Sequence, residues 1–367
     1  MGLSRRKSRW LDAWVKAGKT AARASRQVRK ATRTAVSTQA LEIEKVTRRV
    51  LSGVATPAPP PSGRGGGRWE EGRWGLGPLA LRDYRLFIPP GVSASRPAPL
   101  LMLLHGCGQD AASFAATTRA AALARAEGFA VLLPEQSSQA SPQRCWRWFG
   151  AETRVAGEAM ILMAIVDHIS VLHPVRRESL FALGISAGGS MALTLALRYP
   201  HRFKAVGTHS GAVPHSAAST VQAGQTMRGR RAPNTEALRP RLLGRRLPPL
   251  IVLHGDADPV VSFENARATT ALWLDLLPHE PPKAGRSREV QRGQRRRHTV
   301  TDWRLAGKPY VRLIGIEGLG HAWSGGAPKR AFSDPTGPDA LKLAMRFFCR
   351  ECASASLDLR ALPTATE

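Results

Sequence analysis

Apolar residues occur along the chain in short continuous runs that alternate with amphipathic segments. The runs, which we interpret as strands, lie at 84–89, 100–104, 129–133, 180–184, 203–208, 250–253 and 310–316. Helical spacing of apolar residues is found between them, at 152–172, 187–198, 263–276 and 339–349. Strands that are apolar at every position are typical of a sheet covered on both faces. The pattern therefore predicts an α/β fold with a mostly parallel central sheet and helices on both faces.

The first 56 residues follow a different pattern, because Lys and Arg recur throughout and apolar residues have mixed helical spacing, with Trp10 and Trp14 on one face. We expect a basic helical extension, which is either an amphipathic helix for an anionic or hydrophobic surface or a loosely ordered tail. Proline and glycine then dominate a linker. The expected parts are the extension at 1–56, the linker at 57–68, an α/β domain at 69–350 and a tail at 351–367.

Charge is the most unusual feature of the composition. The chain has 54 Lys and Arg against 27 Asp and Glu, a formal net charge of +27, much of it in the first fifty residues and in the run Arg286–Arg297. Both segments are candidate contacts for a polyanion, and solvated surface is the favoured alternative. No aromatic residues interleave with the arginines as they do in single-strand binders, so we do not expect a nucleic-acid partner.

No apolar run is long enough to predict a transmembrane segment. The basic N-terminus lacks the apolar stretch of a secretory signal peptide. Four cysteines in a chain of 367 residues are too few for a disulfide scaffold. We therefore expect a cytoplasmic protein.

The strongest local motif is GISAG, Gly184–Gly188, between an apolar strand and a helix. Serine becomes a useful nucleophile when a sharp strand-to-helix turn holds it beside a base, and the flanking glycines let strand and helix approach closely. The helix N-terminus would present free N–H groups to a developing oxyanion. We interpret Ser186 as the nucleophile. The alternative is a phosphate-binding turn, but the motif lacks the lysine of a P-loop and the spacing of a dinucleotide fingerprint.

A nucleophilic serine needs a base and an acid that orients the base, here expected in the chain order Ser, Asp, His. The strand at 250–253 continues into HGDADP and offers Asp256 and Asp258. Asp258 is favoured because it lies deeper in the loop, whereas Asp256 is better placed to fix the turn by accepting backbone N–H bonds. His321 follows the last predicted strand in a glycine-rich loop and is the expected base.

The loop after the strand at 100–104 reads HGCG. In this arrangement that loop and the residue after the nucleophile supply the N–H groups of an oxyanion hole. The candidates are the backbone N–H groups of Ala187 and of Cys107 or Gly108, with His105 as a structural hydrogen bonder. No His, Cys or carboxylate cluster has metal-ligand spacing, so we expect neither a metal nor a cofactor.

Five blocks occur in order along the chain: HGCGQD, LLPEQSSQASPQRCWRWF, GISAGGSMA, HGDADPVV and GLGHAWSGG. Together they resemble the esterase family of polyhydroxybutyrate (PHB) depolymerases, which also contains feruloyl and acetylxylan esterases. The resemblance covers roughly residues 80–350 and implies an α/β-hydrolase fold and cofactor-free hydrolysis of carboxylic esters. By motif it also implies the triad Ser186, Asp258 and His321.

The resemblance leaves several points open. It places Cys107 and Cys145 in blocks near the site without deciding whether they bond. Secreted members of the family make an extracellular location the alternative to a cytoplasmic one. Three tryptophans near the site form either a flat platform for an acyl chain or polyester repeat, or part of the core: Trp146, Trp148 and Trp323.

The function expected from the sequence is an esterase that forms an acyl-enzyme and cleaves PHB, another polyhydroxyalkanoate or their oligomers. A feruloyl or acetylxylan esterase, a peptidase and a thioesterase on the same scaffold are alternatives. A basic protein with a vestigial hydrolase core that binds nucleic acid or a storage granule is a further alternative. The N-terminal extension is a candidate for contact with a storage-granule surface.

Overall fold

The computed structural model describes residues 66–242, 244–277 and 282–358. The predicted basic extension, nearly all of the predicted linker and the last residues of the predicted tail lie outside this part of the chain. Arg68, assigned to the linker, is the first residue of β1. The final helix continues to Asp358, so the predicted tail begins inside a helix.

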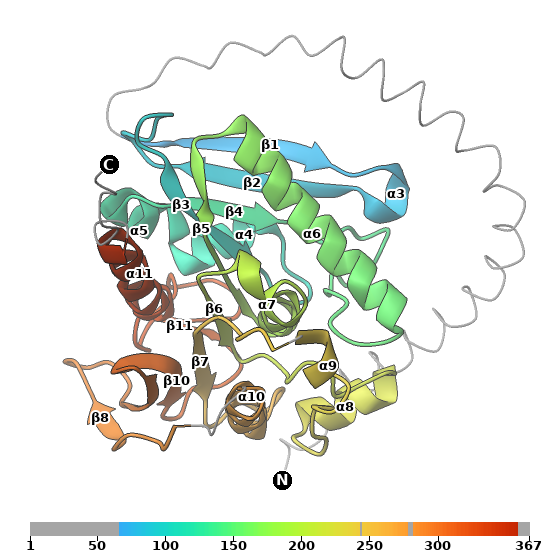
Figure 1. The fold of residues 1–367 in the computed structure, drawn as a ribbon, viewed down its shortest axis with the longest axis vertical. Coiled ribbons are helices and arrows are strands. Elements are labelled where there is room, and N and C mark those ends of the chain that lie inside the picture. Colours follow the sequence, from blue (N-terminus) through green and yellow to red (C-terminus); the bar gives the residue numbers. More distant parts are fainter. Residues whose placement is uncertain (1–65, 243, 278–281, 359–367) are drawn as a thin grey trace, which may run out of the picture. The chain divides into compact units, whose positions relative to one another are not determined.

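One ten-stranded sheet runs through the described residues, in the order β1-β2-β4-β3-β5-β6-β7-β10-β9-β8 (Figure 1). The strands are β1 (Arg68–Trp74), β2 (Arg82–Ile88), β3 (Ala98–Leu104), β4 (Ala130–Pro134), β5 (Val175–Ile185), β6 (Ala205–His209), β7 (Leu250–Gly255), β8 (Arg288–Val290), β9 (His298–Leu305) and β10 (Lys308–Ile316). The six inner strands, from β4 to β10 in sheet order, all pair in parallel. The mostly parallel sheet predicted from the sequence is confirmed.

The edges of the sheet are antiparallel. β1 and β2 extend it on one side, and β9 and β8 extend it on the other. A further pair of short parallel strands, β11 (Trp323–Ser324) and β12 (Ser333–Asp334), lies outside the main sheet. This small pair follows the loop that carries His321 and so bears on how that loop is held.

Helices cover both faces of the sheet. They are α3 (Gly77–Ala80), α4 (Ala111–Thr118), α5 (Ala120–Glu127), α6 (Glu152–Leu172), α7 (Ala187–Arg198), α8 (Thr220–Met227), α9 (Arg239–Leu242), α10 (Glu264–Asp275) and α11 (Ala340–Asp358), with a 3₁₀ turn at Pro200–Arg202. Residues of α4, α5 and α11 share one buried cluster with alternate residues of the strands. The other face is covered by α6 and α7, which contact each other, and by α10 against β7 and β10.

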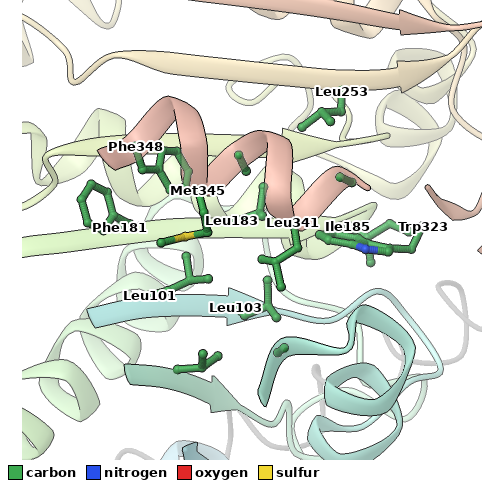
Figure 2. Packing of buried hydrophobic residues seen from close by; sticks show 14 of the residues in the cluster. Leu101, Leu103, Phe181, Leu183, Ile185, Leu253, Trp323, Leu341, Met345 and Phe348 are labelled. Carbon is green, nitrogen blue, oxygen red and sulfur yellow. The ribbon is translucent and has the colours of Figure 1, made fainter. Parts of the chain in front are cut away.

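In the buried cluster under α11, helix residues spaced three or four apart pack against alternate residues of the strands (Figure 2). Alternate residues of β5, Phe181 and Leu183, point to the same face as Leu101 of β3. Phe348 of α11 stacks on Phe181, with ring centroids 5.0 Å apart. Burying each such large side chain stabilises the fold by about 1.5–3 kcal/mol.

One described helix, α6, is long and apolar enough to cross a membrane by length and composition alone. The contacts that α6 makes with the rest of the fold give another explanation for its apolar composition. The helix packs against β4, β5 and α7 through buried residues that include Leu162, Ile165 and Ile169. Its apolar character is therefore that expected of a helix covering a sheet.

Candidate active site

Ser186 lies between β5 and α7 in a strained turn, with φ 55° and ψ −124°. Its neighbours leave no room for larger residues. A Cβ added to Gly188 would lie 2.2 Å from the Leu104 carbonyl oxygen, and one added to Gly184 would lie 2.4 Å from Gly188. The backbone N–H of Ser186 donates to the carbonyl of His209 at 2.9 Å. The glycines thus bring β3, β5 and α7 together, and the serine stands at the carboxyl end of the sheet.

Asp258 and His321 meet at the same end of the sheet. His321 Nδ1 lies 2.8 Å from Asp258 Oδ2, and Asp258 Oδ1 accepts the N–H groups of Val260 and Val261, both at 2.9 Å. Burial alone would raise the pKa of Asp258, but the hydrogen bond and charge of His321, the nearby His254 and the backbone donor together lower it below its usual value. Asp258 is therefore ionised and holds the Nδ1–H of the imidazole.

Asp256 has a different contact. Its Oδ1 accepts the backbone N–H of Gly318 at 2.7 Å, in the loop that leads to His321. Its own N–H donates to Ile316 at the end of β10. This carboxylate fixes the backbone of the loop, as expected of it from the sequence.

The loop after β3 offers one free donor among the sequence candidates. Gly108 N–H donates to the Gln143 carbonyl at 2.7 Å, and Gly106 N–H donates to Gln109 Oε1 at 2.9 Å. No hydrogen bond within the described residues uses the Cys107 N–H. Ala187 begins α7, where the first N–H groups have no partner inside the helix. The Gly108 alternative is therefore disfavoured, and Cys107 and Ala187 remain as candidate oxyanion donors.

A disulfide joins Cys107 to Cys145, the pairing that the sequence left open. The bond and the Gly108–Gln143 hydrogen bond both connect the loop after β3 to the segment that precedes α6. The candidate oxyanion loop is thus held at two adjacent residues by one neighbouring segment.

A buried polar network supports the same loop from within. His105 Nε2 accepts the N–H of Gln136, whose side-chain amide donates to Glu158 Oε2 at 2.8 Å. Glu158 Oε1 pairs with Arg82 at 2.8 Å, and both side chains are 2% exposed. Burial lowers the pKa of His105 to about 4, so its ring is neutral and acts as a structural hydrogen bonder.

A polar cavity of about 260 Å³ is lined by residues of β1, of β2 and of the segment that follows β4. Its lining includes two ion pairs, Arg73–Asp83 and Arg144–Glu135. Because each charge already has a partner of opposite sign, the cavity shows no preference for a charged ligand.

Comparison with known proteins identifies the family. The chain matches the sequence model described as esterase PHB depolymerase over residues 82–291. The chain belongs to this esterase family. The family resemblance drawn from the five sequence blocks is therefore confirmed. The matched residues include Ser186 and Asp258, whereas His321 lies beyond them.

Individual relatives of this chain differ in their named substrates. It is 32% identical over 150 residues to poly(3-hydroxyalkanoate) depolymerase C of Paucimonas lemoignei, a match that covers 40% of this chain and 35% of that protein. It is 26% identical over 224 residues to feruloyl esterase B of Neurospora crassa, covering 56% and 73%. The chain thus spans about a third of the depolymerase and most of the feruloyl esterase.

Among solved structures, the chain resembles the acetyl xylan esterase from Aspergillus awamori, with a TM-score of 0.61 and 17% identity over 77% of this chain and 99% of that one. At this level of identity the likeness concerns the fold alone. It confirms the α/β-hydrolase fold predicted from the sequence.

The three tryptophans proposed as a substrate platform are buried in the structure. Trp146, Trp148 and Trp323 are 1%, 6% and 0% exposed. Trp146 Nε1 donates to the His105 carbonyl at 2.9 Å, and Trp323 packs edge-on against Phe114. Their burial and contacts favour the alternative, that they pack the core around the site, over an exposed substrate platform.

Several arginines of the run Arg286–Arg297 form hydrogen bonds or ion pairs with other residues of the same chain. Arg296 pairs with Asp334 of β12 at 2.7 Å and donates to the Glu317 carbonyl, and Arg295 donates to Gly337. Arg297 lies 3.6 Å from the Glu317 carboxylate. These arginines connect β12 to the start of the His321 loop, so polyanion contact is not needed to explain them.

Within the described ranges, no group of three or more His, Cys, Asp or Glu side chains could hold a metal ion. Two buried histidines near the candidate site residues were missed from the sequence. His254 Nε2 lies 2.8 Å from the Val261 carbonyl and 3.6 Å from Asp258, and His209 lies behind Ser186. His209 is the last residue of β6 and His254 is the next-to-last residue of β7, both at the carboxyl end of the sheet. This position after an apolar run was the sequence signal that could have identified them.

Proposed function

We propose that this member of the family is a serine esterase with Ser186 as nucleophile, His321 as base and Asp258 as the acid that orients the base. The observation that carries the proposal is the hydrogen bond between His321 Nδ1 and the ionised Asp258. With its proton on Nδ1, the imidazole keeps the lone pair of Nε2 for the hydroxyl of a serine.

In the proposed reaction, His321 Nε2 takes the proton of Ser186 while Oγ bonds to the ester carbonyl carbon. The Ala187 and Cys107 N–H groups hold the resulting oxyanion. His321 then gives its proton to the leaving alcohol as the carbon–oxygen bond breaks. Water repeats the sequence on the acyl-enzyme and releases the acid, while Asp258 stabilises the imidazolium in both halves.

We propose polyhydroxyalkanoates or their soluble oligomers as the substrate class. The family description and the similarity to a depolymerase support this choice. The similarity to feruloyl esterase B supports the alternative of an aryl or acetylated plant-type ester. A peptidase or thioesterase would be indicated by turnover of amides or thioesters without turnover of oxygen esters.

The location of the protein is also a proposal. Disulfides persist in oxidising compartments and are rare in the cytosol. The Cys107–Cys145 bond therefore favours the extracellular alternative over a cytoplasmic location. The proposal that the basic N-terminus binds storage granules rests on its sequence. Deleting residues 1–60 without any change in granule association would refute it.

Hydrolysis of p-nitrophenyl butyrate by the wild type and by Ser186→Ala tests the function. We expect turnover by the wild type that the variant abolishes, after which hydroxybutyrate trimers and methyl ferulate would separate the two substrate classes. A folded wild type that turns over none of these esters, while Ser186→Ala binds DNA in a salt-dependent way, would instead favour the binding-protein alternative.

A further inference from the structure

His209, the last residue of β6, contacts both halves of the proposed site. Its backbone carbonyl accepts the N–H of Ser186 at 2.9 Å. Its ring Nε2 accepts the N–H of Ser324 at 3.2 Å, three residues after His321. The nucleophile turn and the base loop come from different strands and are distant in sequence. One residue therefore connects their backbones.

The His209 ring is held firmly. It is fully buried and stacks on Trp323, with centroids 5.2 Å apart and an angle of 25° between the planes. Trp323 in turn packs edge-on against Phe114 of α4, with centroids 5.4 Å apart. The hydroxyl of Ser324 donates to Pro338 at 2.7 Å. The ring can therefore shift only if the base loop and α4 shift with it.

The hydrogen bonds also define the protonation of the ring. Because Nε2 accepts an N–H, the proton of the neutral ring lies on Nδ1, which is 3.2 Å from Ser210 Oγ. Burial, followed by the nearby His254 and His321, lowers the pKa of His209 to about 3. The acceptor at Nε2 therefore persists at neutral and mildly acidic pH.

We propose that His209 is a positioning residue that sets the separation of Ser186 and His321, through its carbonyl on the nucleophile side and its ring on the base side. This inference rests on the proposed serine mechanism. Proton transfer requires the two reacting atoms at hydrogen-bond distance, and a misplacement of about 1 Å can cost about 10²-fold in rate.

A purely structural role predicts different behaviour. A buried residue that only stabilises the fold would affect activity in proportion to the loss of folded protein. A positioning residue affects kcat in fully folded protein, leaves KM nearly unchanged, and is replaced in part by a side chain that restores the acceptor. The two roles can therefore be separated by variants that differ in the acceptor alone.

His209→Gln and His209→Met form such a pair, because the chains are similar in length and Gln offers the Ser324 N–H a strong oxygen acceptor, whereas the Met sulfur is only a weak acceptor. His209→Phe keeps a ring against Trp323 and removes the acceptor. Trp273→Phe is the matched control, since it removes a buried hydrogen bond to Pro248, which precedes the amino end of β7, whereas His209 lies at the carboxyl end of β6. Each variant is measured for melting temperature, for kcat and KM on p-nitrophenyl butyrate, and for its rate of labelling by a fluorophosphonate.

We expect His209→Met and His209→Phe to lose about 10²-fold in kcat and in labelling rate, with KM within about twofold, and His209→Gln to recover about tenfold of that loss. Trp273→Phe should retain its kcat at a similar loss of melting temperature. Equal kcat for Gln and Met, or wild-type kcat in folded His209→Phe, would overturn the inference alone. A wild type inert to both ester and fluorophosphonate would overturn the proposed function, and this inference with it.

Discussion

Two neutral histidines, His105 and His209, are buried at the ends of the strands on either side of the strand that leads to Ser186, and they should make the fold sensitive to acid. Burial lowers the pKa of His105 to about 4 and that of His209 to about 3. In the unfolded chain both would titrate near the ordinary value of about 6.5. Lowering the pH from 8 to 5 therefore protonates these side chains in the unfolded state and not in the folded state.

The linkage relation gives the direction and size of the effect. Below about pH 6.5 the unfolded chain binds protons that the folded chain does not, so the free energy of unfolding decreases as the pH decreases. The stabilisation is complete above the unfolded pKa and is lost progressively down to the folded values. At pH 5 the loss is about 2 kcal/mol for each histidine, about 4 kcal/mol for the pair. Asp258, whose pKa is also lowered, adds a loss of the same sign at more acidic pH.

Urea unfolding followed by tryptophan fluorescence at pH 8, 6.5 and 5 measures this dependence. His209→Gln should reduce the difference between pH 8 and pH 5 by about 2 kcal/mol, because it removes the contribution of one buried histidine. The remaining difference comes from His105 and from other histidines whose pKa burial lowers, such as His254. His201 is exposed, so His201→Gln is the control and should leave the difference unchanged. If the His209→Gln protein lost as much free energy of unfolding between pH 8 and pH 5 as the wild type, the reasoning would be refuted.

Three further experiments test other features of the molecule. Asp258→Asn should lower kcat by about 10³–10⁴ with the fold intact, and Asp256→Asn should not; the reverse result would exchange their roles. Glu158→Ala leaves Arg82 buried without its partner and should cost about 3–5 kcal/mol in urea unfolding. Gly188→Ala should prevent stable folding, whereas Gly157→Ala, with no atom within 4 Å of the added Cβ, should be neutral or stabilise α6 by up to about 1 kcal/mol in thermal melts.

The central sheet was predictable because its strands are apolar at nearly every position, as at Ala130–Pro134. The edge strands were not. β1 reads RWEEGRW and β8 reads REV, and such charged segments form strands only because a neighbouring strand supplies hydrogen bonds. Tertiary pairing overrides local preference at these edges.

The site was predictable to the extent that its residues follow strands. Gly184–Gly188, Asp258 and His321 each come at the carboxyl end of a strand, where a parallel sheet gathers them. The choice between Cys107 and Gly108 depends on Gln143, far along the chain, which takes up the Gly108 N–H. Aromatic residues serve both cores and binding surfaces, so the sequence left the role of Trp323 open.

The conformation of Ser186 has a consequence for how the protein would respond to selection. A side chain at φ 55° and ψ −124° is strained in any L-residue, and glycine would relieve that strain. Directed evolution for heat resistance alone should therefore favour Ser186→Gly, at the cost of the proposed nucleophile. A screen for heat-resistant variants must therefore measure ester turnover together with the fraction of protein that stays folded. The strained backbone in the turn between β5 and α7 belongs to the residue that the proposed activity requires.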